Sequence, residues 1–170
     1  MSLPASGHYL ITSNKNHHLI GRHLAEDLSL LPKSVYQLPT NSSNDFKVNG
    51  WIVEELEGRK YILRAKGAPT GVFRDNRVSA ILLSQPAPEH WVLETTDQAN
   101  VYVIKTSDGK LGWTIEDPSA EDSPVSTPSY IQGSTLFSAS KAQGRRFENT
   151  LLIKVTDHPD KFDFTPVKSD

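Results

Sequence analysis

Side chains suited to binding or chemistry are concentrated in one segment of this sequence, residues 21–34. The segment reads Gly-Arg-His-Leu-Ala-Glu-Asp-Leu-Ser-Leu-Leu-Pro-Lys-Ser, so basic, acidic and hydroxyl groups stand beside four leucines. Leu24, Leu28 and Leu31 recur at helical spacing, but Pro32 follows at once, and we expect a loop with room for one helical turn. Leucines in such a loop either pack against the protein or are displayed to a partner. Composition alone favours packing.

Side-chain arrangements typical of enzymes do not occur in the sequence. HExxH, GxSxG, the P-loop and GxGxxG are all missing. The adjacent His17 and His18 lie at an expected hairpin turn and predict a surface turn rather than a metal site. Glu54, Glu55 and Glu57 lie on or beside an expected strand without a second convergent group, so they indicate solvated charges. We therefore expect a protein that is not an enzyme and that uses no cofactor and no metal.

Composition limits the partners and the architecture. With 170 residues, 18 basic and 20 acidic side chains and a net charge of −2, the chain predicts one domain, residues 1–170, that binds neither nucleic acid nor a membrane. It contains no cysteine, which excludes disulfides and suits a reducing compartment. The N-terminus lacks the pattern of a signal peptide, and no apolar run could span a bilayer. We expect a cytoplasmic monomer.

The elements that position this loop are short segments rich in β-branched and aromatic residues, separated by turn residues, which is typical of all-β proteins. They repeat. Segments 7–13, 59–65 and 100–106 each carry a tyrosine two positions before an aliphatic residue. Second, third and fourth strands are expected in every copy, at 19–22, 35–38 and 51–54, then 71–74, 78–83 and 91–94, then 111–115, 151–155 and 162–165.

Three copies of a four-strand unit predict a β-trefoil. In this fold six of the twelve strands form a barrel, the other six form a cap of hairpins, and the three units are related by pseudo-threefold symmetry. The repeats are expected at about 7–56, 57–98 and 99–167. Trp51 and Trp91 stand at equivalent positions and are expected in the core, whereas the position of Trp113 stays open. The third repeat contains an insertion at about 117–149 that begins with Ser, Pro and acidic residues, as solvated loops do.

The sequence resembles the mushroom serine protease inhibitors with a β-trefoil fold, the mycospins, which are related to clitocypin and macrocypin. The similarity lies in residues 1–4 and 7–11, in the strands that begin at Trp51 and Trp91, and in residues 21–33. It covers most of the chain apart from the insertion. Its most distinctive part is the stretch Glu-Asp-x-Ser-Leu-Leu-Pro-Lys.

The resemblance implies inhibition by a loop between the second and third strands that enters a protease as a substrate would. The family carries arginine at the residue that fills the S1 pocket of trypsin, and the matching residue is Leu28. Leucine suits the hydrophobic S1 pocket of chymotrypsin-like or elastase-like enzymes rather than trypsin-like ones. The expected reactive loop consists of Glu26, Asp27, Leu28, Ser29 and Leu30. If another residue fills S1, the candidates are Arg22, Lys33, Arg145 and Lys161, and each of these cations would keep a trypsin-like protease among the expected partners.

Two other binding functions stay open at this point. A carbohydrate-binding trefoil lectin is one, although the Gln-x-Trp motif of ricin-type lectins is missing. Trp113, Tyr130 and the Asn-rich segment 41–49 leave room for a single degenerate sugar site. The other is a cysteine protease inhibitor, since trefoil relatives of that class use the loops after the first and third strands.

Overall fold

The computed structural model describes residues 2–116 and 151–168. Twelve strands occur in these ranges, four in each repeat. They are β1 (Gly7–Ser13), β2 (Ile20–Arg22), β3 (Lys33–Gln37), β4 (Trp51–Leu56), β5 (Lys60–Ala65), β6 (Ala68–Phe73), β7 (Arg77–Ala80), β8 (Trp91–Thr95), β9 (Val101–Lys105), β10 (Gly112–Ile115), β11 (Leu151–Thr156) and β12 (Phe162–Pro166).

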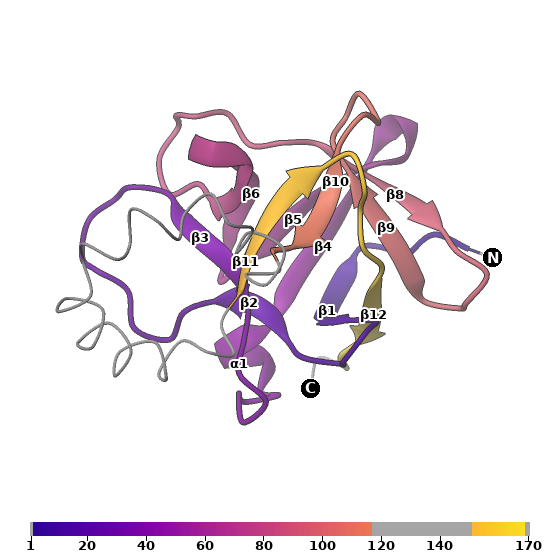
Figure 1. Ribbon diagram of the computed structural model, residues 1–170, viewed down its shortest axis with the longest axis horizontal. Coiled ribbons are helices and arrows are strands. Elements are labelled where there is room, and N and C mark those ends of the chain that lie inside the picture. The colour runs from indigo at the N-terminus through magenta and orange to yellow at the C-terminus, as the bar shows by residue number, and fades with distance from the viewer. Residues whose placement is uncertain (1, 117–150, 169–170) are drawn as a thin grey trace, which may run out of the picture.

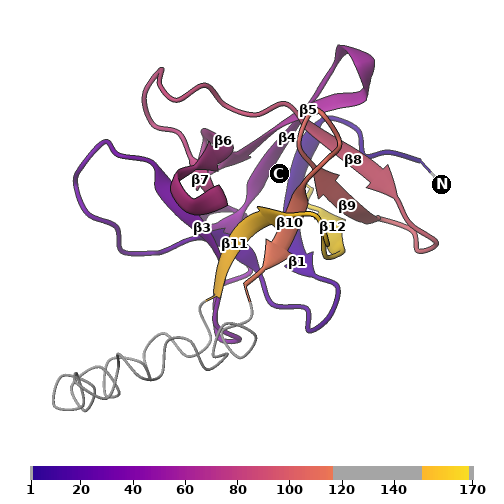
Figure 2. The ribbon, with the colours of Figure 1, turned by 45° about the horizontal axis from the view of Figure 1, so that its top comes forward.

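Six of the strands close into a barrel. Antiparallel pairing runs from β1 to β4, β5, β8, β9 and β12 and returns to β1. The other six form three hairpins, β2–β3, β6–β7 and β10–β11, and strands β3, β7 and β11 also pair with one another. These three mutual pairings make the triangular cap, and Figure 2 shows β3, β7 and β11 close together. The predicted β-trefoil is confirmed.

The tryptophans meet in the centre of the fold. Trp51, Trp91 and Trp113 are all fully buried, and the Trp113 ring lies 5.7 Å from Trp51 and 5.4 Å from Trp91 between centroids. Phe162 occupies the corresponding position of the third repeat, 5.8 Å from Trp113. The prediction for Trp51 and Trp91 is therefore correct, and Trp113 joins the same core. This burial excludes Trp113 as an exposed platform for a sugar ring.

The three repeated tyrosines hold the N-terminal segment. The hydroxyl groups of Tyr9, Tyr61 and Tyr102 donate to backbone carbonyl oxygens of Ala5 at 2.8 Å, Pro4 at 3.0 Å and Ser2 at 3.0 Å. Because β1 runs from this segment toward the cap, the segment lies at the opposite end of the barrel. Burial raises the pKa of Tyr61 to about 12, so its hydroxyl stays protonated and able to donate.

The structure corrects two local predictions. The third strand of the second repeat, expected over 78–83, ends at Ala80, which leaves Leu82 and Leu83 in the following loop. No helical turn forms within residues 21–34. Instead, the short helix α1 (Phe46–Asn49) lies between β3 and β4, where the Asp45 carboxylate accepts a hydrogen bond from the backbone of its first turn.

Some expectations fall outside the described ranges. The insertion at 117–149, with Tyr130 and Arg145, lies among the residues that are not described. Within residues 2–116 and 151–168, every helix is too short to cross a bilayer.

Candidate functional site

The loop between β2 and β3 (residues 23–32, the β2–β3 loop) projects from the cap at the left of Figures 1 and 2. Its four leucines are exposed rather than packed, with exposed fractions of 82% for Leu24, 99% for Leu28, 60% for Leu30 and 62% for Leu31. The packing interpretation is therefore wrong. The interior beneath the loop is already filled by Ile20, Val35 and Trp113, and a closely packed core has no room for further leucines.

Arg22 anchors the first half of this loop. Its side chain is buried, and its Nε and Nη2 atoms donate to the two carboxylate oxygens of Glu26 at 3.0 and 2.6 Å. A third guanidinium nitrogen donates to the backbone oxygen of Ala65 at 3.2 Å. Such a bidentate, charge-assisted pair is strong and directional. Arg22 is therefore a support of the loop, and its guanidinium is buried.

Lys33 anchors the second half. Its ammonium, also buried, donates to the Asp27 carboxylate, to the backbone oxygen of Asp27 at 3.3 Å and to the Ser29 hydroxyl at 3.1 Å. The Asp27 carboxylate also accepts from the backbone N–H of Ser29 at 2.9 Å and from the Ser29 hydroxyl. We call this set of contacts the Lys33 clamp. It ties the residues on both sides of Leu28 to one another and leaves Leu28 as the exposed apex.

The Lys33 clamp predicts a pH dependence of the loop. Hydrogen bonds from the Lys33 ammonium, and next those from Ser29, lower the pKa of Asp27 from 3.8 to about 2. A depressed pKa means that the stabilisation is fully present above the ordinary value and is lost as pH falls through about 2. We expect the Asp27 carboxyl carbon to titrate near pH 2 in NMR spectra, and to titrate higher in Lys33→Met. An unshifted midpoint in the unmodified protein would show that the clamp does not persist in solution.

The remaining candidate cations lie elsewhere. Lys161 is in the loop between β11 and β12, where its backbone oxygen accepts from Asn14 N at 3.1 Å, and its side chain is half exposed. Its ammonium lies 3.8 Å from the exposed Asp97 carboxylate. Arg145 belongs to the residues that are not described.

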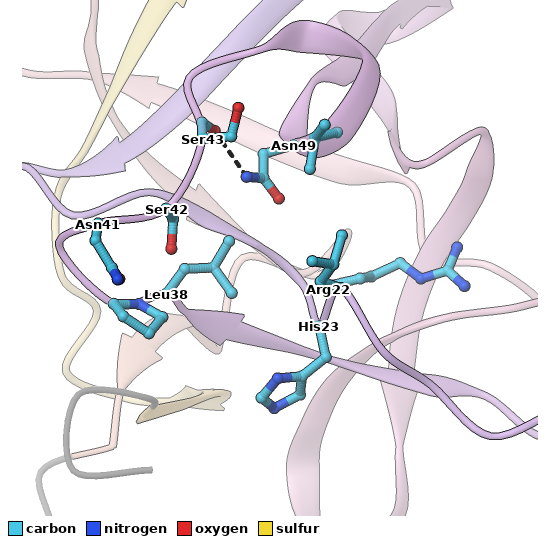
Figure 3. Close-up of a pocket in the computed structure, with 10 residues that line it drawn as sticks. Arg22, His23, Leu38, Asn41, Ser42, Ser43 and Asn49 are labelled. Atoms are coloured by element: carbon cyan, nitrogen blue, oxygen red, sulfur yellow. Dashed lines mark hydrogen bonds between the residues drawn. The ribbon is translucent and has the colours of Figure 1, made fainter. Parts of the chain in front are cut away.

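A cavity of about 420 Å³ lies beside the β2–β3 loop, between it and the segment that links β3 to β4. Figure 3 shows Asn41, Ser42 and Asn49 around it, with the Asn49 amide donating to the Ser43 backbone oxygen at 2.7 Å. The Asn-rich segment 41–49 therefore does line a cavity. Its described lining contains no Trp, Tyr or Phe ring, and His23 is the single ring beside it apart from proline.

Neither histidines nor carboxylates assemble into a metal site in the part of the chain that the structure describes. No three His, Asp or Glu side chains come together there. His17 is exposed in the turn after β1, where its backbone is left-handed with φ 62°.

Fold and loop together define a class: a β-trefoil that presents a braced, solvent-exposed loop. Residues 1–141 match the family described as Peptidase inhibitor I66, and the chain belongs to this family. A protein of Lentinula edodes named serine protease inhibitor is 38% identical over 118 residues, which is 68% of this chain and 78% of that protein. The predicted family of fungal trefoil inhibitors is thus confirmed, and membership of an inhibitor family agrees with a protein that is not an enzyme.

Three solved structures are similar to this chain in fold. The proteinase inhibitor from Coprinopsis cinerea has a TM-score of 0.68 and 26% identity, over 98% of this chain and 100% of that one. A ricin B-like lectin from Macrolepiota procera in complex with lactose reaches a TM-score of 0.61 at 12% identity, over 98% of this chain and 100% of that one. The designed threefold-symmetric protein ThreeFoil has a TM-score of 0.62 and 12% identity, over 95% of this chain and 99% of that one. The last two likenesses show the fold alone.

Sequence reasoning singled out the β2–β3 loop but not the side chains that brace it. Arg22 and Lys33 are named there as candidates for the S1 pocket, whereas in the structure both side chains are buried and bonded to residues of the loop. The order basic, acidic, acidic, basic at Arg22, Glu26, Asp27 and Lys33 is a signal in the sequence that could have indicated this.

Proposed function

We propose that this protein inhibits a serine protease of chymotrypsin-like or elastase-like specificity through the β2–β3 loop. Leu28 fills the S1 pocket, and the Leu28–Ser29 peptide bond lies at the catalytic serine. The observation that carries the proposal is the position of Leu28, 99% exposed at the apex of a loop whose flanking residues are both held by Lys33. Family membership supplies the activity class.

A braced loop inhibits the protease, whereas a flexible loop would be cleaved and its products released. Binding loses little ordering entropy, because the hydrogen bonds of the Lys33 clamp already fix the backbone around Leu28. If the protease cleaves after Leu28, Asp27 and Ser29 are still bonded to the same ammonium, so the new ends stay together. A leaving group that stays in place favours resynthesis of the bond over product release.

The S1 assignment follows from chemistry and exposure. A leucine side chain fits a hydrophobic S1 pocket and cannot pair with the acidic residue at the base of a trypsin pocket. Burial of one such side chain at the centre of an interface is worth about 2 kcal/mol or more. Arg22 and Lys33 are buried supports and are left out of this role. Of the four candidate cations, Lys161 is the described one with an exposed ammonium, which would direct trypsin inhibition from another loop.

A panel of proteases tests the proposal. The protein should inhibit chymotrypsin and subtilisin at one molecule per enzyme, elastase to a similar or smaller degree, and trypsin and papain weakly. Inhibition of trypsin alone would contradict Leu28 as the S1 residue and favour Lys161 or Arg145. Inhibition of papain alone would favour the cysteine protease class. Size-exclusion chromatography should show a monomer and a 1:1 complex.

A further inference from the structure

The exposed apolar side chains gather on two loops that adjoin. In the described residues, the large hydrophobic side chains with high exposure are Leu24, Leu28, Leu30, Leu31 and Leu83. The first four lie on the β2–β3 loop, and Leu83 lies on the loop between β7 and β8 (residues 81–90, the β7–β8 loop). Monomeric proteins seldom expose such groups together unless the surface binds a partner.

Strand pairing places these loops side by side. Lys33, the first residue of β3, is the register partner of Ala80, the last residue of β7. One loop therefore ends where the other begins, and Figures 1 and 2 both show them projecting from the same side of the molecule. Leu30 and Leu31 are in the half of the β2–β3 loop that follows Ser29 and reaches Lys33. The β7–β8 loop thus adjoins the C-terminal side of the Leu28–Ser29 bond.

The β7–β8 loop is attached firmly at both ends. Ile81 N donates to Pro69 O at 2.7 Å, and Glu89 N donates to Thr70 O at 3.0 Å. Gly71 lets the loop backbone approach β6, since a Cβ atom there would lie 3.2 Å from Glu89 N. Leu83 is 56% exposed on this support. Residues 81–88 carry no charged side chain, which fits the uncharged centre of a protease–inhibitor interface.

The size of such interfaces requires more than one loop. A standard protease–inhibitor complex uses about 20–30 residues on each side. The β2–β3 loop has ten, residues 23–32. We propose that the β7–β8 loop, through Leu83, makes a second contact with the protease that Leu28 engages, on the C-terminal side of the reactive bond. This inference rests on the proposed function of the β2–β3 loop.

Leu83→Asp tests the second contact. The change places a charge in an apolar contact and should weaken inhibition of chymotrypsin or subtilisin by about tenfold, mainly through faster dissociation. Ala99→Asp is the matched control, because it adds the same charge on the exposed loop between β8 and β9, at the opposite side in Figures 1 and 2. It should leave the inhibition constant within twofold. Leu83→Ser, with the melting temperature of every variant, separates lost contact from lost folding.

The outcomes are distinguishable. If Leu28 variants change inhibition but Leu83→Asp and Leu83→Ser act like Ala99→Asp, the second contact is wrong and the proposed function stands. If Leu28 variants also change nothing, the proposed function fails. A complex with two proteases per inhibitor would overturn the inference, because Leu83 would then serve an independent site. So would dimers of the free protein that Leu83→Asp dissolves, since a second copy would then cover this surface.

Discussion

Replacement of Leu28 with arginine is expected to redirect the protein from chymotrypsin-like to trypsin-like proteases. The guanidinium cannot be desolvated in a hydrophobic S1 pocket without a partner, but it pairs with the acidic base of a trypsin pocket. Loss of a central interface side chain costs about 2–4 kcal/mol, so inhibition of chymotrypsin should fall by about 30-fold to 1,000-fold. Inhibition of trypsin should rise by a comparable factor. Inhibition constants measured against both enzymes check the exchange.

Ala99→Arg is the matched control for this prediction. Ala99 is exposed on the loop between β8 and β9, which lies on the opposite side of the molecule from the β2–β3 loop in Figures 1 and 2. It should change neither inhibition constant by more than about twofold, and an exposed substitution should alter stability by no more than about 0.5 kcal/mol. Equal effects of the two variants would indicate a general charge effect. A sharp fall in melting temperature for Leu28→Arg, with inhibition unchanged, would contradict an exposed apex and the S1 assignment together.

Lys33→Met is expected to turn the inhibitor into a substrate. Methionine keeps most of the buried apolar stem but removes the ammonium that bonds the Asp27 backbone, the Asp27 carboxylate and the Ser29 hydroxyl. Charge-assisted hydrogen bonds are stronger than neutral ones, although the exposure of Asp27 reduces what these contacts contribute. We expect an inhibition constant about tenfold to a hundredfold higher, with cleavage after Leu28. Mass spectrometry during incubation with chymotrypsin would detect the cleaved chain.

Lys105→Met is the control for removal of a lysine charge. Lys105 on β9 pairs with Glu94 on β8 at 2.7 Å and is far more exposed than Lys33. A surface pair contributes at most about 1 kcal/mol and does not touch the β2–β3 loop, so inhibition should not change. Hydrogen exchange at the Ser29 amide gives a second measurement, which should become faster in Lys33→Met alone. Unchanged exchange and unchanged inhibition in Lys33→Met would show that the clamp does not brace the loop.

In the β2–β3 loop, the burial that composition predicts differs from the exposure that the structure shows. Its leucines favour burial by residue type, yet they are exposed, because the three tryptophans and Phe162 already fill the space under the cap. The hydrogen bonds of Lys33 depend on how the two ends of the loop leave β2 and β3. The charge order along the loop indicates a pairing, but not which groups meet.

The sequence by itself determined the architecture. Tyrosines and fourth-strand aromatics recur three times, and their period-two alternation places one face of each strand in a common core. Those signals are local to each repeat, and they are why the barrel and cap could be predicted.

Only the tertiary structure decided which side chains face the solvent around Leu28 and which loop adjoins it. Lys33 and Ala80 are register partners on strands of different repeats. Their proximity therefore follows from closure of the cap and not from any short-range pattern in the sequence. Exposure of Leu83 follows in the same way, since β7 ends at Ala80, opposite Lys33, where its neighbour β3 begins. Local sequence specifies strands, whereas a surface is created only when distant strands pair and the interior is full.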